Sequence, residues 1–528
     1  MAHATHPRRE QWSGQRGFIL AAIGSAIGLG NIWRFPGVAY ENGGGAFLIP
    51  YLIALLTAGI PVLLFDYAIG HRFRGSAPTA FRRLAQRAEL LGWFQVAICF
   101  VIILYYTVII AWSASYLGFS FTKAWGDDPA GFFTGGFLHV ASTPGVSLDV
   151  VPGVLWPLLA VWVLVLAVLA LGVQKGLERA NVVGLPVLVV LFVAMVIRAL
   201  FLPGAMDGLN AFFTPDWSAL TDPGVWIAAY SQIFFSLSVA FGIMVTYSSY
   251  LKRKTNLTAT GLVVGFANSS FELLAGVGVF AALGFMANQN GTTIAELDGI
   301  SGVSLAFVAF PQIISMMPGG PIFGVLFFAS LTLAGLTSLL SLLQVVSAAF
   351  QEKFGLSIRQ GAIRVGGAAA VVSLVLFSTT TALPVLDTVD KYINEVGIVA
   401  SAILATVLVA WVLGRLPELQ RHLNAVSTLQ LGGWWRWLVG VVVPVVLLIM
   451  FVSGVIDLVA NGYGDYPRWF SNTLGWGMLA AVVAGALVLD ALRWRRSPDE
   501  FVPDALPDVV PSATAAPRSP QTREELVR

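Results

Sequence analysis

Long runs of apolar residues, separated by short polar segments, occupy this chain from about residue 17 to residue 492. The hydrocarbon core of a membrane is about 30 Å thick, so a helix needs roughly 20 apolar residues to cross it. We number the twelve candidate runs as spans 1 to 12: 17–40, 45–70, 91–121, 154–173, 182–202, 225–250, 258–286, 321–350, 363–382, 393–413, 435–457 and 474–492. The pattern predicts an all-α integral membrane protein with twelve transmembrane helices.

The composition supports this class. Of the 528 residues, 57% are hydrophobic and 11% are charged, whereas soluble domains carry about 25% charged residues. Cys99 is the only cysteine, so no intramolecular disulfide can form. The five histidines fall outside the interiors of the spans, so a metal site built on Cys or His is not expected.

The positive charges are placed unevenly along the chain. Most of the 30 Lys and Arg residues lie in the two terminal segments and in the loops after even-numbered spans, with Lys123, Lys391 and Arg468 as exceptions. Cytoplasmic loops carry an excess of Lys and Arg. We therefore expect a multi-pass protein of the cell membrane with both termini in the cytoplasm.

Two spans contain residues that disfavour a continuous helix. Span 1 holds "SAIGLGN" (25–31), and span 6 holds "FFSLSVAFG" (234–242). Broken helices at matching positions of two halves indicate a transporter binding site. Each of these spans begins a block of five, and because five is odd the second block starts on the opposite side of the membrane. The halves are then inverted repeats.

This arrangement predicts five regions along the chain. They are a cytoplasmic N-terminal segment at 1–16, a first repeat at 17–202, a second repeat at 225–413, two further helices at 435–492, and a disordered cytoplasmic tail at 497–528.

An unwound segment inside a membrane leaves backbone groups unpaired, at a cost of several kcal/mol each. Freed carbonyl oxygens suit a small cation, and freed amides at a helix N-terminus suit an anion. A carboxylated substrate together with Na⁺ would satisfy both. For Gly24 and Gly28 alone, close helix packing is an equal alternative.

Other polar residues lie within the spans. Asn268 and Glu272 are four residues apart on span 7, Tyr105 and Tyr106 lie on span 3, and Thr337 and Ser338 on span 8. Ionisable groups inside a membrane indicate function by default. For each hydroxyl residue alone, a bond to the carbonyl four residues earlier is the plainer interpretation.

Several motifs resemble those of the neurotransmitter:sodium symporter family, especially its bacterial amino-acid transporters of the LeuT type. They are "GLGNIWRFP" with "ENGGGAFLIPY", "QIFFSLSVAFG" and "LAGLTSLLSLLQ", and the resemblance covers about residues 9–492. It implies the LeuT-type 5+5 inverted repeat with interrupted helices 1 and 6, plus two C-terminal helices. It also implies a Na⁺-coupled amino-acid symporter that works by alternating access and is not an enzyme. Its partners would be a small-molecule amino-acid substrate and membrane lipid, without nucleic acid.

The resemblance implies two Na⁺ sites built from oxygen ligands. The first comprises the carbonyl of Ala26, the side chains of Asn31, Ser236 and Asn268, and the substrate carboxylate. The second comprises the carbonyls of Gly24, Ile27 and Ala334 and the hydroxyls of Thr337 and Ser338. Ligation by oxygen alone suits a hard cation.

The resemblance also places the substrate between spans 1, 3, 6 and 8. Its carboxylate would meet the amides of Leu29 and Gly30 and the hydroxyl of Tyr106, and its amine the carbonyls near Ser25, Ala26, Phe235 and Ser238. The side chain would be surrounded by Ile102, Phe235, Phe241, Ser338 and Leu342.

Two positions bear on the substrate class. Gly28 stands where monoamine carriers of the family have an aspartate, so an α-amino acid fits better than a monoamine, and the apolar lining favours a hydrophobic or aromatic one. Ala240 stands where many bacterial members have glycine, which leaves the size of that side chain open.

Glu272, with Gln232 beside it, resembles the carboxylate that replaces chloride in bacterial members. We therefore expect no chloride requirement. A buried carboxylate can also take up a proton when Na⁺ leaves, so counter-transport of protons is a further possibility.

The resemblance implies gates and a flexible span. The outer gate would comprise Arg34, Asp390 and the Phe235 lid, and the inner gate Arg9, Glu352, Trp12 and Tyr250. Gly176 and Pro186 match a family pattern in span 5, where local unwinding would open a water path for Na⁺; a loop glycine with a packing kink is the plain alternative.

Two other functions stay open from the sequence. One is a carrier of the same fold for another carboxylated osmolyte or an amine, and the other is an amino-acid sensor that does not transport.

Overall fold

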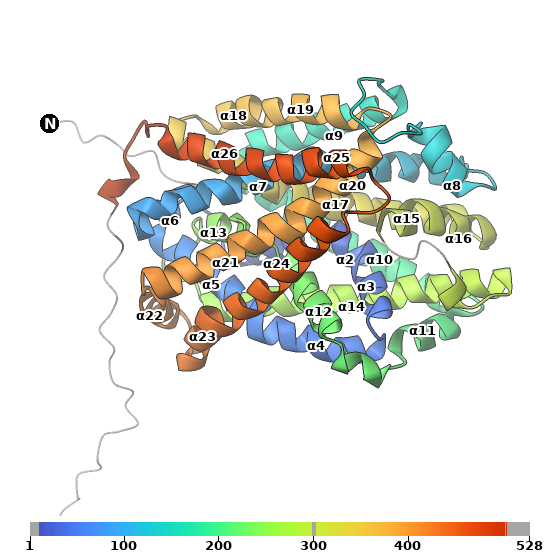
Figure 1. Cartoon of the computed structure of the whole chain (residues 1–528), viewed down its shortest axis with the longest axis horizontal. Helices are drawn as coiled ribbons and strands as arrows, with labels where there is room; N and C mark the ends of the chain where they lie inside the picture. Colours follow the sequence, from blue (N-terminus) through green and yellow to red (C-terminus); the bar gives the residue numbers. More distant parts are fainter. Residues whose placement is uncertain (1–9, 298–301, 502, 504–528) are drawn as a thin grey trace, which may run out of the picture.

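The computed structural model describes residues 10–297, 302–501 and 503. Its helices run mainly along one direction and form a bundle, drawn horizontally in Figure 1. Within these described residues, ten helical segments are long and apolar enough to cross a membrane, and a bent pair of helices, Gln15–Ala26 and Leu29–Glu41, makes an eleventh. A second interrupted pair, at 223–248, occupies the place of span 6, so the described segments agree with twelve spans.

The first repeat contains spans 1 to 5, in which some helices continue through 3-10 or π-helical turns, labelled η. They are α1 (Gln15–Ala26), α2 (Leu29–Trp33) and α3 (Phe35–Glu41); η1 (Gly45–Phe47), α4 (Leu48–Ala54), η2 (Leu55–Gly59) and α5 (Ile60–Phe73); η3 (Gln86–Ala88) and α7 (Glu89–Ser120); α9 (Pro152–Ala170); and η5 (Val173–Glu178) and α10 (Arg179–Leu200).

Spans 6 to 10 make up the second repeat, and spans 11 and 12 follow it. They are α12 (Pro223–Ser236) and α13 (Ile243–Ser248); α14 (Leu257–Asn290); α17 (Gly320–Phe354); α18 (Ile358–Gly361), η9 (Ala362–Gly366) and α19 (Gly367–Phe377); α20 (Ala382–Tyr392), η10 (Ile393–Ile398), α21 (Val399–Val407) and η11 (Leu408–Val412); α23 (Gly433–Trp437), η12 (Leu438–Val442) and α24 (Val443–Ala460); and α25 (Arg468–Ser471), η13 (Asn472–Trp476) and α26 (Gly477–Ala491).

Short helices lie at the two ends of the bundle. α6 (Ala77–Leu84) and α22 (Leu416–Val426) lie at one end, which we call the α6 end, and the opposite end, the α11 end, carries α8 (Pro129–Gly131), α11 (Ala205–Phe213), α15 (Gly302–Ser304) and α16 (Phe310–Met316) (Figure 1). The remaining short turns are η4 (Phe132–Phe137), η6 (Trp217–Thr221), η7 (Ile294–Glu296), η8 (Leu305–Ala309) and η14 (Pro498–Glu500).

Burial separates a central set of spans from a peripheral set. About 78% of the most apolar window of the span containing α7, and of α14, is buried, against 17% for the span containing α26 and 33% for those containing α9 and α24. Since lipid is as apolar as a protein core, the exposed residues of the outer spans carry no penalty in a membrane. The site must therefore be sought among the central helices.

The two breaks have identifiable backbone causes. In span 1 the chain leaves helical geometry at Ile27 and Gly28, and α1 and the helix beginning at Leu29 are bent by 55°. In span 6 three residues have positive φ, namely Ser238 (54°), Ala240 (65°) and Gly242 (90°). A left-handed conformation costs a non-glycine residue roughly 1–2 kcal/mol, so neighbouring groups must hold this segment.

Side chains from three other spans supply that support at Ala240. Its amide donates to the Asp66 carboxylate over 2.9 Å, and its carbonyl accepts from Gln95 at 2.9 Å and from Ser401 at 2.6 Å. The sequence analysis missed these three residues. Asp66 carried a signal, because it is a lone carboxylate in the apolar run "VLLFDYAIG".

The largest errors in the predicted boundaries lie at the starts of two spans. Span 5 begins at Val173 and not at 182, and span 10 begins at Ala382 and not at 393. Asp387 and Asp390 lowered the apparent hydropathy of the first turns of span 10. Both side chains line a cavity between the central helices, so their charges are compatible with a membrane helix.

The predicted disordered tail is only partly described. Residues 504–528 lie outside the described residues. At its start, η14 forms a turn in which Asp499 pairs with Arg82 of α6 at 2.7 Å. These first residues are therefore bound to the α6 end of the bundle.

Candidate functional site: a cavity between two broken helices

A cavity of about 610 Å³ lies between the broken spans 1 and 6 and spans 3, 8 and 10. It is lined near the breaks by Ser25, Gly28, Phe241 and Ser338, and toward the α11 end by Arg34, Asp390, Lys391 and Tyr463, among others. The cavity thus connects the two breaks with the polar residues of the outer ends of spans 1 and 10.

The residues predicted for the first Na⁺ site are brought together. The amide of Gly28 donates to Asn31 Oδ1 at 2.8 Å, Asn31 Nδ2 donates to Asn268 Oδ1 at 2.9 Å, and Asn268 Nδ2 donates to Ser236 Oγ. All three side chains are buried. This cluster of neutral oxygens beside the break that follows Ala26 is the donor set that a hard cation prefers.

Glu272 lies next to this cluster as predicted, fully buried on α14. It accepts from Gln232 Nε2 at 2.6 Å and from the hydroxyl of Tyr51, which the sequence analysis missed. A buried charge requires hydrogen bonds or an opposite charge. Two donors and a neighbouring cation would meet that need.

The residues predicted for the second Na⁺ site lie where α1 meets α17. A Cβ added at Gly24 would lie 3.5 Å from Thr337 Cβ, which places these two residues in contact. The Thr337 hydroxyl donates to the carbonyls of Leu333 and Ala334, both at 3.1 Å. Back-bonding, the plainer interpretation, thus occurs at Thr337, and its oxygen can still accept a cation.

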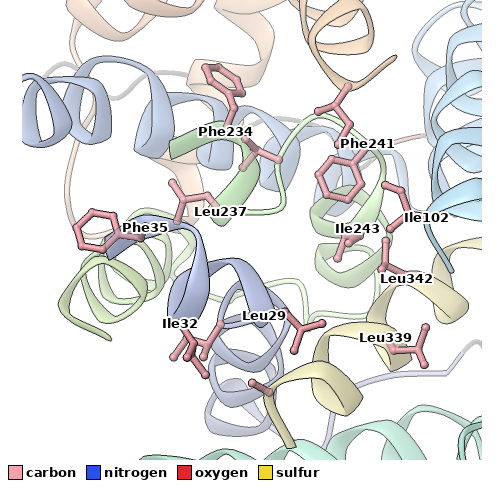
Figure 2. Packing of buried hydrophobic residues seen from close by; sticks show 14 of the residues in the cluster. Leu29, Ile32, Phe35, Ile102, Phe234, Leu237, Phe241, Ile243, Leu339 and Leu342 are labelled. Atoms are coloured by element: carbon pink, nitrogen blue, oxygen red, sulfur yellow. The ribbon is translucent and has the colours of Figure 1, made fainter. Parts of the chain in front are cut away.

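The inner part of the cavity has a polar side and an apolar side. On the polar side, the amide of Leu29 donates to the Tyr106 hydroxyl at 3.1 Å, and Ser238 Oγ donates to the carbonyl of Ser25 at 3.3 Å. On the other side, Figure 2 shows Phe241, Ile102 and Leu342 gathered beside the broken segment of span 6. A Cβ at Gly28 would lie 2.8 Å from the Tyr106 hydroxyl, so a residue larger than glycine would displace Tyr106.

Arg34 and Asp390, predicted as an outer gate, both line the cavity. Within the described ranges, no ion pair of 4.0 Å or less joins them. Instead the Arg34 guanidinium lies 4.7 Å from the ring centroid of Phe235, and Asn394 donates to Asp390 at 2.8 Å. The predicted pair is therefore not joined here, although both of its members line the cavity.

The α6 end is closed around Trp12. Its indole donates to the carbonyl of Tyr247 at 2.9 Å and its amide to the carbonyl of Tyr250 at 3.2 Å. Trp12 is 1% exposed. Glu352 accepts from the backbone and hydroxyl of Ser76 at 2.9 and 2.7 Å, and its predicted partner Arg9 lies outside the described residues.

Span 5 is helical across the segment predicted to unwind. Gly176 lies in the π-helical turn η5, and Pro186 lies inside α10. A π-helical turn carries weaker, wider hydrogen bonding than the α-helix and is often found at functional sites. Two buried residues of this span that the sequence analysis missed, Glu178 and Asn181, face α1.

The chain matches the model of the sodium:neurotransmitter symporter family over residues 9–129 and 124–496. A protein of Methanocaldococcus jannaschii, described as an uncharacterized sodium-dependent transporter, is 39% identical over 486 residues, which cover 92% of this chain and 96% of the relative. The human sodium- and chloride-dependent taurine transporter is 30% identical, over 92% of this chain and 85% of its own length.

A solved structure is also similar. The crystal structure of MhsT in complex with L-phenylalanine matches with a TM-score of 0.71 and 35% sequence identity, covering 84% of this chain and 100% of MhsT. The family match therefore rests on both sequence and fold. The broken spans, the buried oxygen cluster and these relatives together identify the chain as a member of the sodium:neurotransmitter symporter family, a sodium-dependent transporter of the LeuT-type fold.

Proposed function

We propose that this protein imports a hydrophobic or aromatic α-amino acid together with Na⁺. The observation that carries the proposal is the chemistry of the inner cavity. The helices around the two breaks are α1, α2, α7, α12, α13 and α17. None of the described cavity-lining residues on these helices is an Asp or a Glu. A substrate that brings its own carboxylate suits this site, because the carboxylate can serve the first Na⁺ while the amine meets backbone carbonyls.

Two Na⁺ sites would couple the ion gradient to the substrate. In the first, the substrate carboxylate would complete the oxygens of Ala26, Asn31, Ser236 and Asn268, and the second would use Gly24, Ile27, Ala334, Thr337 and Ser338. The affinities of Na⁺ and substrate then raise each other reciprocally. Glu272 would supply the negative charge that chloride supplies elsewhere, so no chloride is required.

The lining of the cavity extends toward the α11 end, whereas Trp12 is buried at the α6 end, and this supports an outward-facing state. The α6 end, rich in Arg and Lys, would face the cytoplasm. Substrate binding would bring Phe235 and the Arg34–Asp390 pair over the site. Opening at Trp12 and loosening of span 5 from Gly176 to Pro186 would then release Na⁺ and substrate inward.

The test is uptake into proteoliposomes. Purified protein should accumulate one of the twenty amino acids under an inward Na⁺ gradient, with phenylalanine and the large aliphatic residues as the first candidates. K⁺ in place of Na⁺ should abolish accumulation. Binding of an amino acid without accumulation would instead favour a sensor, and uptake of taurine or creatine in preference to amino acids would favour the osmolyte carrier.

Replacing Trp12 by alanine should open the α6 end. Trp12 fills a buried site against Phe18 and Tyr247, with ring centroids 5.9 and 5.2 Å away. The native reporter is Cys99, which is buried and donates to the carbonyl of Phe241 at 3.1 Å. We expect alkylation of Cys99 to become at least about tenfold faster as the inner closure is lost.

The matched control is Trp125→Ala, which removes a buried tryptophan at the α11 end whose indole donates to Ser315 Oγ at 2.8 Å. It should leave the alkylation of Cys99 slow. Equal acceleration in both variants would indicate general loosening of the bundle and would contradict a specific inner gate at Trp12.

A further inference from the structure

Asn181 of α10 is fully buried, and half of its carboxamide has no partner. Its Nδ2 donates to the carbonyl of Leu177, one turn earlier, at 2.9 Å. Its Oδ1 has no hydrogen-bond donor among the described residues. Leaving a buried acceptor unsatisfied costs about 1–3 kcal/mol, so a ligand that binds this oxygen would be stabilising.

The unpartnered oxygen points at the second Na⁺ site. A Cβ added at Gly24 would lie 2.2 Å from Asn181 Oδ1 and 3.5 Å from Thr337 Cβ. The next turn of α10 continues this contact, because a Cβ at Gly184 would lie 3.3 Å from Thr337 Cγ2. Asn181 therefore lies beside two of the residues assigned to the ion, on a third span that the assignment did not include.

We propose that the Asn181 carboxamide oxygen is a further ligand of the Na⁺ at the second site. This inference rests on the proposed function, since it adds a residue to one of its ion sites. An amide oxygen is a neutral hard donor suited to such a cation. The ion would satisfy the buried acceptor, and only glycine at position 24 leaves room for the oxygen to approach.

The ligand would join ion binding to the helical state of span 5. The other half of the same carboxamide holds the carbonyl of Leu177, which belongs to the π-helical turn η5. In the same turn, Glu178 accepts from the amide of Ser13 at 3.0 Å, next to the Trp12 closure. Departure of Na⁺ would free Asn181 and remove one restraint on this turn, while unwinding of the turn would withdraw a ligand from the ion.

A purely structural role makes a different prediction. The oxygen could simply accept a weak Cα–H contact from Gly24, as occurs between closely packed helices. In that case the side chain would affect stability equally with and without Na⁺. The two roles therefore differ in the Na⁺ dependence of stability, which needs no substrate to be measured.

The experiment is thermal unfolding of the full-length protein in detergent, titrated with NaCl at constant ionic strength in KCl. Asn181→Leu keeps the volume of the side chain and removes the oxygen. Because one ligand is lost, the Na⁺ concentration for half-maximal stabilisation should rise about tenfold, which corresponds to ~1.4 kcal/mol. Asn181→Asp keeps the oxygen and adds charge, and it should lower that concentration. Ser471→Ala removes a different buried oxygen, a hydroxyl that also has no partner among the described residues. It should leave the half-maximal Na⁺ concentration unchanged.

Opposite shifts in the two Asn181 variants support the proposal, and a packing role does not produce them. If both variants unfold at lower temperature in KCl but keep the wild-type Na⁺ midpoint, Asn181 is a packing residue and the proposal fails. If the wild-type protein shows no stabilisation by Na⁺ at all, the proposed function fails first. If Asn181→Leu does not fold, an unchanged half-maximal Na⁺ concentration in Asn181→Asp is sufficient to reject Asn181 as a ligand of the ion.

Discussion

Replacing Asn31 by alanine should raise the Na⁺ concentration for half-maximal substrate binding by about 100-fold, which corresponds to ~2.8 kcal/mol. The side chain holds the Gly28 amide at 2.8 Å and Asn268 at 2.9 Å. Its loss would leave two buried groups without partners, at about 1–3 kcal/mol each. Substrate affinity at saturating Na⁺ should fall as well, because the carboxylate loses the ion that it would share with Asn31.

Scintillation-proximity binding of the preferred amino acid across a Na⁺ titration measures both effects. Asn42→Ala is the matched control, since Asn42 donates to the carbonyl of Val38 at 2.8 Å at the end of α3. It should bind Na⁺ and substrate as the wild-type protein does. A well-folded Asn31→Ala variant with unchanged Na⁺ dependence would remove Asn31 from the first ion site.

The hydrophobic pattern predicted the spans, with the largest errors at the starts of spans 5 and 10, and the glycine and polar residues within two apolar runs predicted both interruptions. Gly28 and Gly242 stand at breaks that the structure shows, because glycine and polar residues inside an apolar run are locally unfavourable for a membrane helix. The partners of those breaks could not be predicted in the same way. Asp66, Gln95 and Ser401 come from three different spans, and no local pattern reveals which spans pack against residue 240.

Motif resemblance assigned the side chains of the first ion cluster, and the structure brings Asn31, Ser236 and Asn268 into one hydrogen-bonded group. The motifs gave no indication of Tyr51, whose hydroxyl donates to Glu272 as Gln232 does. Whether Arg34 and Asp390 are paired could not be predicted from the sequence either, because the members of a gate would meet in one conformational state and separate in another. The presence of opposite charges at two positions does not determine the conformational state in which they pair.

If Glu272 supplies the negative charge in place of chloride, as proposed, Glu272→Ser should make uptake require chloride. The substitution removes a buried negative charge but leaves the Tyr51 hydroxyl and the Gln232 amide, which both donate to that position. With Na⁺ bound at the proposed first site, such a pocket would attract a small anion. Wild-type uptake should be the same in NaCl and sodium gluconate, whereas uptake by the variant in gluconate should fall about tenfold or more, an effect of ~1.4 kcal/mol or more.

Chloride added back to the variant should restore uptake, and the chloride concentration for half-maximal recovery measures the strength of the new anion site. Glu418→Gln is the matched control. Glu418 lies on α22, pairs with Arg72 at 2.5 Å and with Arg415 at 2.7 Å, and does not line the cavity. It should remain insensitive to chloride. A chloride requirement in the wild-type protein, or a folded Glu272→Ser variant that chloride does not rescue, would contradict the role of Glu272 as the fixed negative charge that balances Na⁺.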